Sequence, residues 1–367
     1  MQFTKTLIAA AAAATVAMFA APLAQAQVPA GYPANYQQLV DGAKKEGKLV
    51  IYGATDSKAA QPLIKDFNTL YPGISVEYND MNSTEVYNRF ISENAAGGDT
   101  ADVLWSSAMD LQMKLAAGGY AMAYKSVEAS KIPGWAVWKD TAYGTTFEPA
   151  AFVYNKRLVT EAEVPHTHAE FVSLISKPKF QDKVTTYDIE KSGVGFMFMT
   201  QDERDFPQFK QLEQAFGAAK VRVQSSTGTM LERISSGENL IGYNVLGSYA
   251  LVRAKTDPSL GVVLPKDYTL IISRVHFINK AAKHPNAAKL WTDYILSHRG
   301  QTVIANGSKL YAIRADVTGE TTSSDLIKMV GEKNIKPLPV SPAVAEYLDP
   351  AIRMAFLKEW KATAGKK

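Results

Sequence analysis

Four short segments place small hydroxyl residues and glycines at the ends of predicted strands. They are GATDS (53–57), WSS (105–107), EKSGVG (190–195) and YNVLGS (243–248). In open α/β sheets, ligands sit beyond the carboxyl ends of strands, where helix N-termini offer free amides to anionic or strongly polar groups. Each segment alone is ordinary turn chemistry, but the four together predict a polar cleft. The candidate ligand-binding residues in the first two segments are Thr55, Asp56, Ser106 and Ser107.

Arg274 is a further candidate, because it interrupts the apolar run TLIISRVHFIN (269–279). A guanidinium inside such a strand needs a partner, since burying an unpaired charge is very costly. One interpretation is a bidentate clamp on a ligand carboxylate or phosphate. The other is a salt bridge within the protein, or an edge position that reaches solvent. Trp105 likewise allows a ligand role and a structural role: it could stack on a ligand ring, or it could belong to the core.

Catalytic patterns are sparse. The five histidines include the pair in PHTH (165–168), which precedes a helix. The metalloprotease, nucleophile-elbow and glycine-rich phosphate-loop motifs do not occur. One S-x-x-K match, Ser176 to Lys179, is interrupted by Pro178 and falls in a loop. We therefore expect a binding protein with no cofactor; an exported hydrolase is the alternative from another class, and turnover of its ligand would reveal it.

The N-terminus predicts export. Lys5 precedes an alanine-rich apolar run, and AQA (24–26) fits the small-residue rule for signal peptidase. The chain has no cysteine, so a lipid anchor, a disulfide and a thiolate metal site are excluded. We expect residues 1–26 to be a signal peptide and the mature protein to be periplasmic, not inserted in the membrane and monomeric. The formal net charge is only +4, and acidic and basic residues are interspersed, so we expect no nucleic-acid partner.

Strands and helices alternate along the rest of the chain, which predicts βαβ units and a mainly parallel sheet. Early strands are expected at 48–54, 74–80 and 101–107, each followed by a helix. The third helix is expected over 107–120, with Ser107 as N-cap and Asp110 completing a capping box. Later strands are expected at 183–188, 239–244, 260–265 and 269–279. The length allows two lobes, with one built from 27–145 and 270–315 and the other from 146–269 and 316–367. The chain would cross between them near 142–147 and again near 267–272.

The segments 48–78, 98–120, 152–158 and 284–301, in this order and spacing, resemble the solute-binding proteins of bacterial ABC importers. The similarity is greatest to the type II group that includes binders of ferric iron, phosphorylated sugars and aminoethylphosphonate. The resemblance implies two α/β lobes, a hinge of crossing strands, and a ligand trapped by closure for delivery to an ABC permease. It also implies anion contacts at Ser192, Gly193, Thr227 and Asn244.

The ferric members are similar enough for a residue-by-residue comparison. Their acid in the first loop is matched by Asp56, but their glutamate falls on Ser107 and their adjacent tyrosines fall on Leu246 and Gly247. Because Fe³⁺ needs several anionic oxygens, we expect no metal site. A small organic anion, either a carboxylate or a phosphorylated compound, is the expected ligand; ferric iron is the alternative. Contact with the ligand by Tyr243 and Tyr249 stays open.

Overall fold

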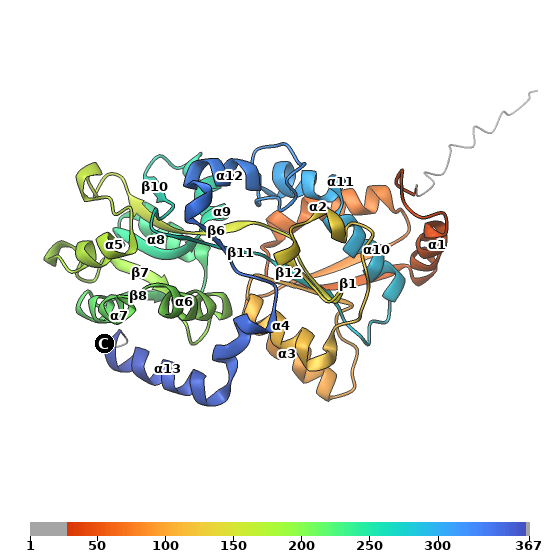
Figure 1. The fold of residues 1–367 in the computed structure, drawn as a ribbon, viewed down its shortest axis with the longest axis horizontal. Helices are drawn as coiled ribbons and strands as arrows, with labels where there is room; N and C mark the ends of the chain where they lie inside the picture. The colour runs from red at the N-terminus through yellow and green to blue at the C-terminus, as the bar shows by residue number, and fades with distance from the viewer. Residues whose placement is uncertain (1–27, 365–367) are drawn as a thin grey trace, which may run out of the picture.

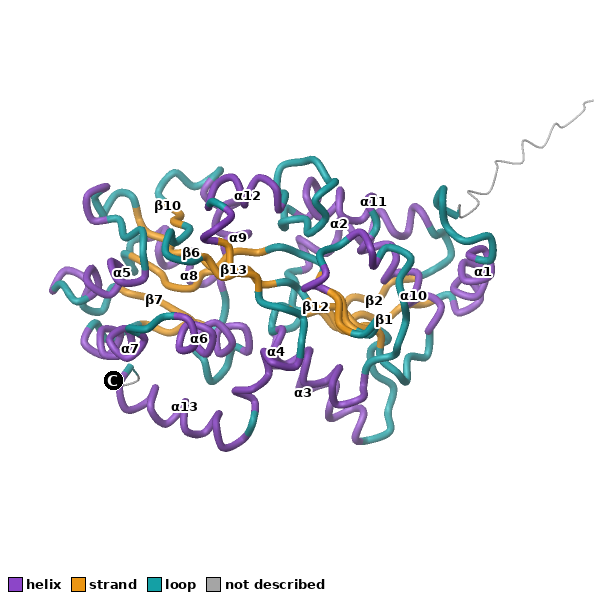
Figure 2. The backbone as a smooth tube through the Cα atoms, viewed as in Figure 1, coloured by secondary structure: helices purple, strands orange, loops and turns teal. Residues whose placement is uncertain are grey.

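The computed structural model describes residues 28–364, which form two α/β lobes side by side along the longest axis (Figure 1). The predicted signal peptide lies outside the described residues. The strands fall into two separate groups, one in each lobe, joined by extended segments near the middle of the molecule (Figure 2). The α/β architecture predicted from the sequence is confirmed, but the mainly parallel sheet is not, because both sheets combine parallel and antiparallel pairs.

The first lobe contains a six-stranded sheet in the order β2-β1-β3-β12-β5-β4. β1, β2 and β3 are parallel, whereas β12 is antiparallel to both β3 and β5. Its strands are β1 (Lys48–Gly53), β2 (Ser75–Asp80), β3 (Val103–Ser106), β4 (Val137–Trp138), β5 (Ala142–Gly144) and β12 (Val275–Ile278). Its helices are α1 (Tyr36–Glu46), α2 (Ser57–Leu70), α3 (Ser83–Ala95), α4 (Met109–Leu115), α10 (Pro285–Leu296) and α11 (His298–Val303).

The second lobe contains a sheet in the order β13-β11-β6-β9-β7-β8, with β10 also paired to β6. Its strands are β6 (Glu148–Asn155), β7 (Val184–Tyr187), β8 (Arg222–Gln224), β9 (Ile241–Leu246), β10 (Leu260–Val263), β11 (Thr269–Ile272) and β13 (Ile335–Pro337). Its helices are α5 (His168–Ile175), α6 (Gly193–Asp205), α7 (Phe209–Ala218), α8 (Thr227–Ser236), α9 (Gly247–Ala254), α12 (Ser323–Val330) and α13 (Pro350–Thr363). β7, β8 and β9 run parallel, so their carboxyl ends share one edge.

The chain crosses between the sheets three times: between β5 and β6, between β11 and β12, and after α11 on the way to α12. The single strand expected over 269–279 is wrong, because β11 and β12 belong to different sheets. Consequently β11, which we assigned to the first lobe from residue 270, pairs in the second sheet instead. Two hydrogen bonds join the break between β11 and β12 to the crossing between β5 and β6. Arg274 N donates to Thr146 Oγ1 at 2.9 Å, and Thr146 N donates to Ser273 Oγ at 3.1 Å.

A proline accounts for the start of α10, whereas the capping signal expected for α4 was wrong. Pro285 occupies the start of α10, where its missing N–H has no intrahelical partner to lose. α4, in contrast, begins at Met109 with Ala108 as its N-cap, so the capping box expected at Ser107 does not form. Asp110 Oδ1 instead accepts from the amide of Leu111 at 2.8 Å. Among residues 28–364, the structure contains no helix with the length and apolarity needed to cross a membrane.

Candidate functional site

A cavity of about 240 Å³ lies between the two lobes, and we call it the inner cavity. The first lobe contributes the residues that follow β1, β2 and β3, and the second lobe contributes those that follow β7, β8 and β9. This is the edge at which parallel strands and helix starts place polar groups. The lining residues from the first lobe are Ala54, Asp56, Asp80, Met81, Asn82, Ser83 and Ser107. Those from the second lobe are Tyr187, Ser192, Val194, Ser225, Ser226, Thr227, Gly228, Leu246 and Tyr249.

The starts of α2, α3, α6, α8 and α9 all contribute residues to this cavity. The first amides of a helix have no intrahelical acceptor, and the helix dipole adds partial positive charge there. In α6 and α8 the serines before the helix, Ser192 and Ser226, each satisfy one later amide. Within residues 28–364, the amides of Thr227 and Gly228 have no acceptor, and both residues line the cavity. The wall from the second lobe therefore suits a negative group.

The wall from the first lobe carries two carboxylates. Asp80 Oδ2 accepts from the amide and the hydroxyl of Ser57, at 2.7 and 2.9 Å, so it serves the start of α2. Asp56 precedes that helix without capping it, and its carboxylate has no partner in the described part of the chain. Burial raises the pKa of Asp56, and the nearby Arg274 offsets only part of this effect. Asp56 is therefore free to accept a hydrogen bond from a ligand hydroxyl or amino group.

Two tyrosines, Tyr187 and Tyr249, line the inner cavity, and of the two tyrosines that the sequence left open only Tyr249 is among them. Tyr249 reaches the first lobe, where its hydroxyl accepts a hydrogen bond from the amide of Asp56 at 3.3 Å. Burial raises the pKa of Tyr249 to about 12. Tyr187 shares a short hydrogen bond with Thr227 Oγ1. Tyr243 points the other way, into the second lobe, where its hydroxyl donates to Asp202 Oδ2 at 3.0 Å. The two tyrosines that flank the β9–α9 junction thus face different environments.

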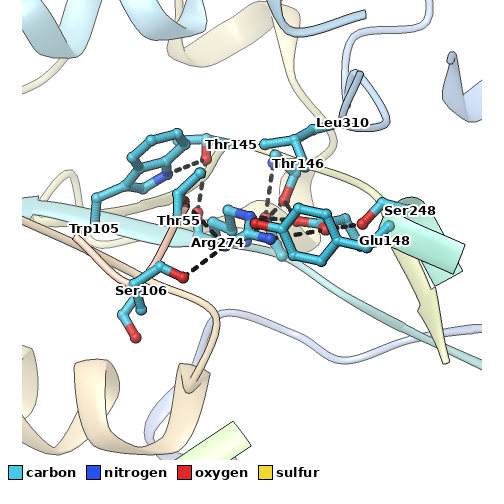
Figure 3. Close-up of polar contacts among 12 residues, drawn as sticks. Thr55, Trp105, Ser106, Thr145, Thr146, Glu148, Ser248, Arg274 and Leu310 are labelled. Atoms are coloured by element: carbon cyan, nitrogen blue, oxygen red, sulfur yellow. Dashed lines mark hydrogen bonds and ion pairs between the residues drawn. The ribbon is translucent and has the colours of Figure 1, made fainter. Parts of the chain in front are cut away.

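Arg274 lies beneath the inner cavity in a fully buried ion pair with Glu148, at 2.7 Å from Nε to Oε1 (Figure 3). Its Nη1 also donates to the carbonyl of Ala54 at 3.1 Å and to Thr55 Oγ1 at 2.9 Å. Burial alone lowers the pKa of Arg274, but the Glu148 carboxylate together with Tyr249 and Tyr78 more than offsets this, so the pKa lies above its ordinary value. The internal salt bridge, one of the two interpretations from the sequence, is the contact present here; Arg274 is absent from the cavity lining.

Three other residues singled out in the sequence are buried and absent from the cavity lining. Thr55 is buried against Arg274. Ser106 is buried, and its hydroxyl accepts from the amide of Ala108 at 3.2 Å. Trp105 is fully buried in the core of the first lobe, where its Nε1 donates to Thr145 Oγ1 at 2.8 Å. Only Asp56 and Ser107 of the first-lobe candidates line the inner cavity.

Asn244 lies within the second lobe, away from the cavity lining. Its Nδ2 donates to Asp202 Oδ2 at 2.6 Å, beside the hydroxyls of Tyr243 and Tyr268, which bond the same carboxylate. The φ of Asn244 is 55°, a left-handed conformation that asparagine tolerates better than most residues. This conformation and the hydrogen bond to Asp202 explain the asparagine without a ligand.

Gly193 lies where the two lobes touch. A Cβ at this position would lie 2.7 Å from Leu111 Cδ1 and 3.1 Å from Ser83 Oγ, both of the first lobe. Next to it, the amide of Val194 donates to Ser83 Oγ at 3.3 Å. The start of α6 therefore makes direct contact with α3 and α4 across the cleft, and only a glycine fits there without displacing its neighbours.

The sequence reasoning missed several lining residues. Asp80, Asn82 and Ser83 lie at the carboxyl end of the second strand. Ligands sit beyond such strand ends in open α/β sheets, so the rule that selected the other four segments also selects these three residues. Tyr187 has no such signal, because a tyrosine in a strand is ordinarily core. Among the described residues, no group of three or more His, Cys, Asp or Glu could hold a metal ion. Of the four positions matched to ferric ligands, Asp56 lines the cavity with a carboxylate, Ser107 and Leu246 line it without an anionic oxygen, and Gly247 is absent from the lining.

Comparisons with known proteins bear on the family and the fold of the chain. Residues 53–302 match the family model for the bacterial extracellular solute-binding protein. The substrate binding protein of an ABC transporter from Agrobacterium tumefaciens is 40% identical, with 86% of this chain and 94% of that chain covered and a TM-score of 0.81. The search of curated proteins gave no match.

More distant structures share the fold. The periplasmic binding protein AfuA from Actinobacillus pleuropneumoniae, with fructose-6-phosphate bound, is 19% identical at a TM-score of 0.71, covering 87% of this chain and 99% of that one. Iron-bound HitA from Pseudomonas aeruginosa is 16% identical at a TM-score of 0.69, covering 86% and 99%. The two-lobed type II periplasmic binding protein fold expected from the sequence is confirmed, and the chain belongs to the bacterial extracellular solute-binding protein family.

Proposed function

We propose that this protein is the periplasmic solute-binding component of an ABC importer and that it captures a small organic anion between its lobes. The observation that carries the proposal is the inner cavity, where the start of α8 presents two open amides and the serine and threonine at the starts of α6 and α8 present hydroxyls. The name of the 40% identical Agrobacterium tumefaciens protein supports the transporter partner.

Each wall has a separate role in this proposal. The negative group of the solute binds at Ser192, Thr227 and the amide of Gly228, where the helix dipoles favour it. Asp56 accepts a hydrogen bond from a hydroxyl or amino group at the other end. A solute with both features fits better than a bare inorganic ion, because the two walls differ in charge.

Binding is coupled to closure. The lobes are joined by crossing segments, and the contact of Gly193 and Val194 with α3 and α4 forms only when the cleft is shut. A ligand that touches both walls stabilises this closed form. The closed form is then the one that the membrane permease of the importer recognises.

The test begins with native mass spectrometry of the protein as purified, followed by identification of any released molecule. Calorimetry with that molecule should show binding weakened about tenfold or more in Thr227→Val and Ser192→Ala, since each loses a hydrogen bond to a charged group. Ser173→Ala on the exposed face of α5 is the matched control and should bind normally. A neutral or cationic solute, or turnover of the solute by the protein, would refute the proposal.

A further inference from the structure

A second pocket, of about 480 Å³, adjoins the inner cavity and shares Asp56, Gly228 and Tyr249 with it. We call it the outer pocket. Both lobes line it: α2 and the turn after α11 on one side, α8 and α9 on the other. Its position makes it a continuation of the cleft and not a separate depression on one lobe.

The outer pocket differs from the inner cavity in charge. Three cationic side chains line it: Lys58 at the start of α2, Arg253 near the end of α9, and Lys309. Lys58 has no ion-pair partner in the described part of the chain. Arg253 lies 3.7 Å from Asp257, and Lys309 pairs with Glu320. Asp56 is the only acid in the lining.

A buried hydroxyl gives an independent sign of a ligand. Ser308 lines the outer pocket with only 6% of its surface exposed, and its Oγ has no hydrogen-bond partner within residues 28–364. Buried hydroxyls are normally paired, because an unpaired one loses its hydration without compensation. The Ser308 hydroxyl thus lacks a partner that a group bound in this pocket would supply.

We propose that the outer pocket binds a second acidic group of the transported solute, a carboxylate or a phosphate, while the first acidic group lies in the inner cavity. The inference rests on the proposed function and narrows it to an elongated dianion. Lys58 and Arg253 attract the second group from opposite lobes, so the same group also favours closure. Ser308 donates a hydrogen bond to it.

The test compares linear dicarboxylates of four to ten carbons with monocarboxylates of equal length, and ω-phosphonocarboxylates as a separate arm, by calorimetry. We expect at least one dianion to bind about tenfold more tightly than its matched monoanion, and the better of the two dianion series identifies the second group. Lys58→Met and Ser308→Ala should each weaken that dianion about threefold to fivefold, in the range of exposed charge pairs and single hydrogen bonds. Neither should affect the monoanion.

Lys65→Met, further along α2 and outside the outer pocket, removes the same charge and is the control. If no dianion binds more tightly than its monoanion, or if Lys58→Met and Lys65→Met weaken binding equally, the inference is wrong. Binding of a monoanion that depends on Thr227 would then leave the proposed function standing. If the wild-type protein binds neither the dianions nor the monoanions, both the inference and the proposed function are wrong.

Discussion

Arg274 and Glu148 form an ion pair whose two side chains are completely buried at the point where the lobes join. Glu148 begins β6 after the first crossing, and Arg274 lies at the second crossing, so the pair ties two hinge segments together. Ser248 at the start of α9 also donates to Glu148. The pair therefore links the hinge to both walls of the cleft without lining the cavity.

We predict that Arg274→Ala destabilises the fold by about 3–5 kcal/mol, because it leaves a buried carboxylate without its partner. Chemical denaturation measures this loss. The double variant Arg274→Met with Glu148→Gln should recover much of the stability, since no unpaired charge remains. Wild-type stability of Arg274→Ala together with lost anion binding would show instead that Arg274 is the ligand clamp.

Gly193→Ala should hinder closure. The added methyl group would clash with Leu111 across the cleft, so the solute-bound protein should keep a larger radius of gyration and bind about tenfold or more weakly. Small-angle scattering with the solute identified by mass spectrometry measures the first effect. Adding Leu111→Ala should restore closure, and Gly134→Ala, which has open space around it, is the control. Equal compaction of Gly193→Ala and wild type would contradict the closure contact.

Asp110 should make stability depend on pH. It is buried between the lobes, and burial raises its pKa to about 7. The folded protein therefore keeps a proton that the unfolded chain loses near pH 4. Consequently the free energy of unfolding falls as pH rises from about 4 to 7, by at most roughly 4 kcal/mol, and then levels off.

The variant Asp110→Asn replaces the carboxyl group with an amide, which stays neutral at every pH tested. It should be more stable than wild type at pH 8, with the difference shrinking toward pH 4, as measured by denaturant unfolding at several pH values. Asp41→Asn on the exposed face of α1 should show no such difference. A constant offset between Asp110→Asn and wild type at every pH would rule out the titration of Asp110.

Ferric citrate should produce no tyrosinate-to-iron charge-transfer band. Ser107 and Leu246 place no anionic oxygen in the inner cavity, and burial keeps the pKa of Tyr249 at about 12, which disfavours the tyrosinate. Visible absorption spectroscopy checks this. A band that disappears in Tyr249→Phe but persists in Tyr243→Phe, whose phenol bonds Asp202, would establish an iron site and restore the ferric alternative.

The sequence by itself was enough for the two-lobed α/β fold and for part of the cleft. Alternation of apolar runs with helix patterns is a local property, and it placed β1, β2, β3, β7 and β9 close to their observed bounds. The carboxyl-end rule selected Asp56 and Ser107, and the family resemblance implied Ser192 and Thr227; all four line the inner cavity.

Only the tertiary structure decided which polar side chains face the cavity and which face the protein. Arg274 and Asn244 carry the same groups that a ligand site needs, but each found a buried acid, Glu148 or Asp202, contributed by a segment more than forty residues away in sequence. The split of 269–279 into β11 and β12 has the same origin. An apolar run looks alike whether it stays in one sheet or crosses to another, and the choice depends on long-range pairing with β6 and β3.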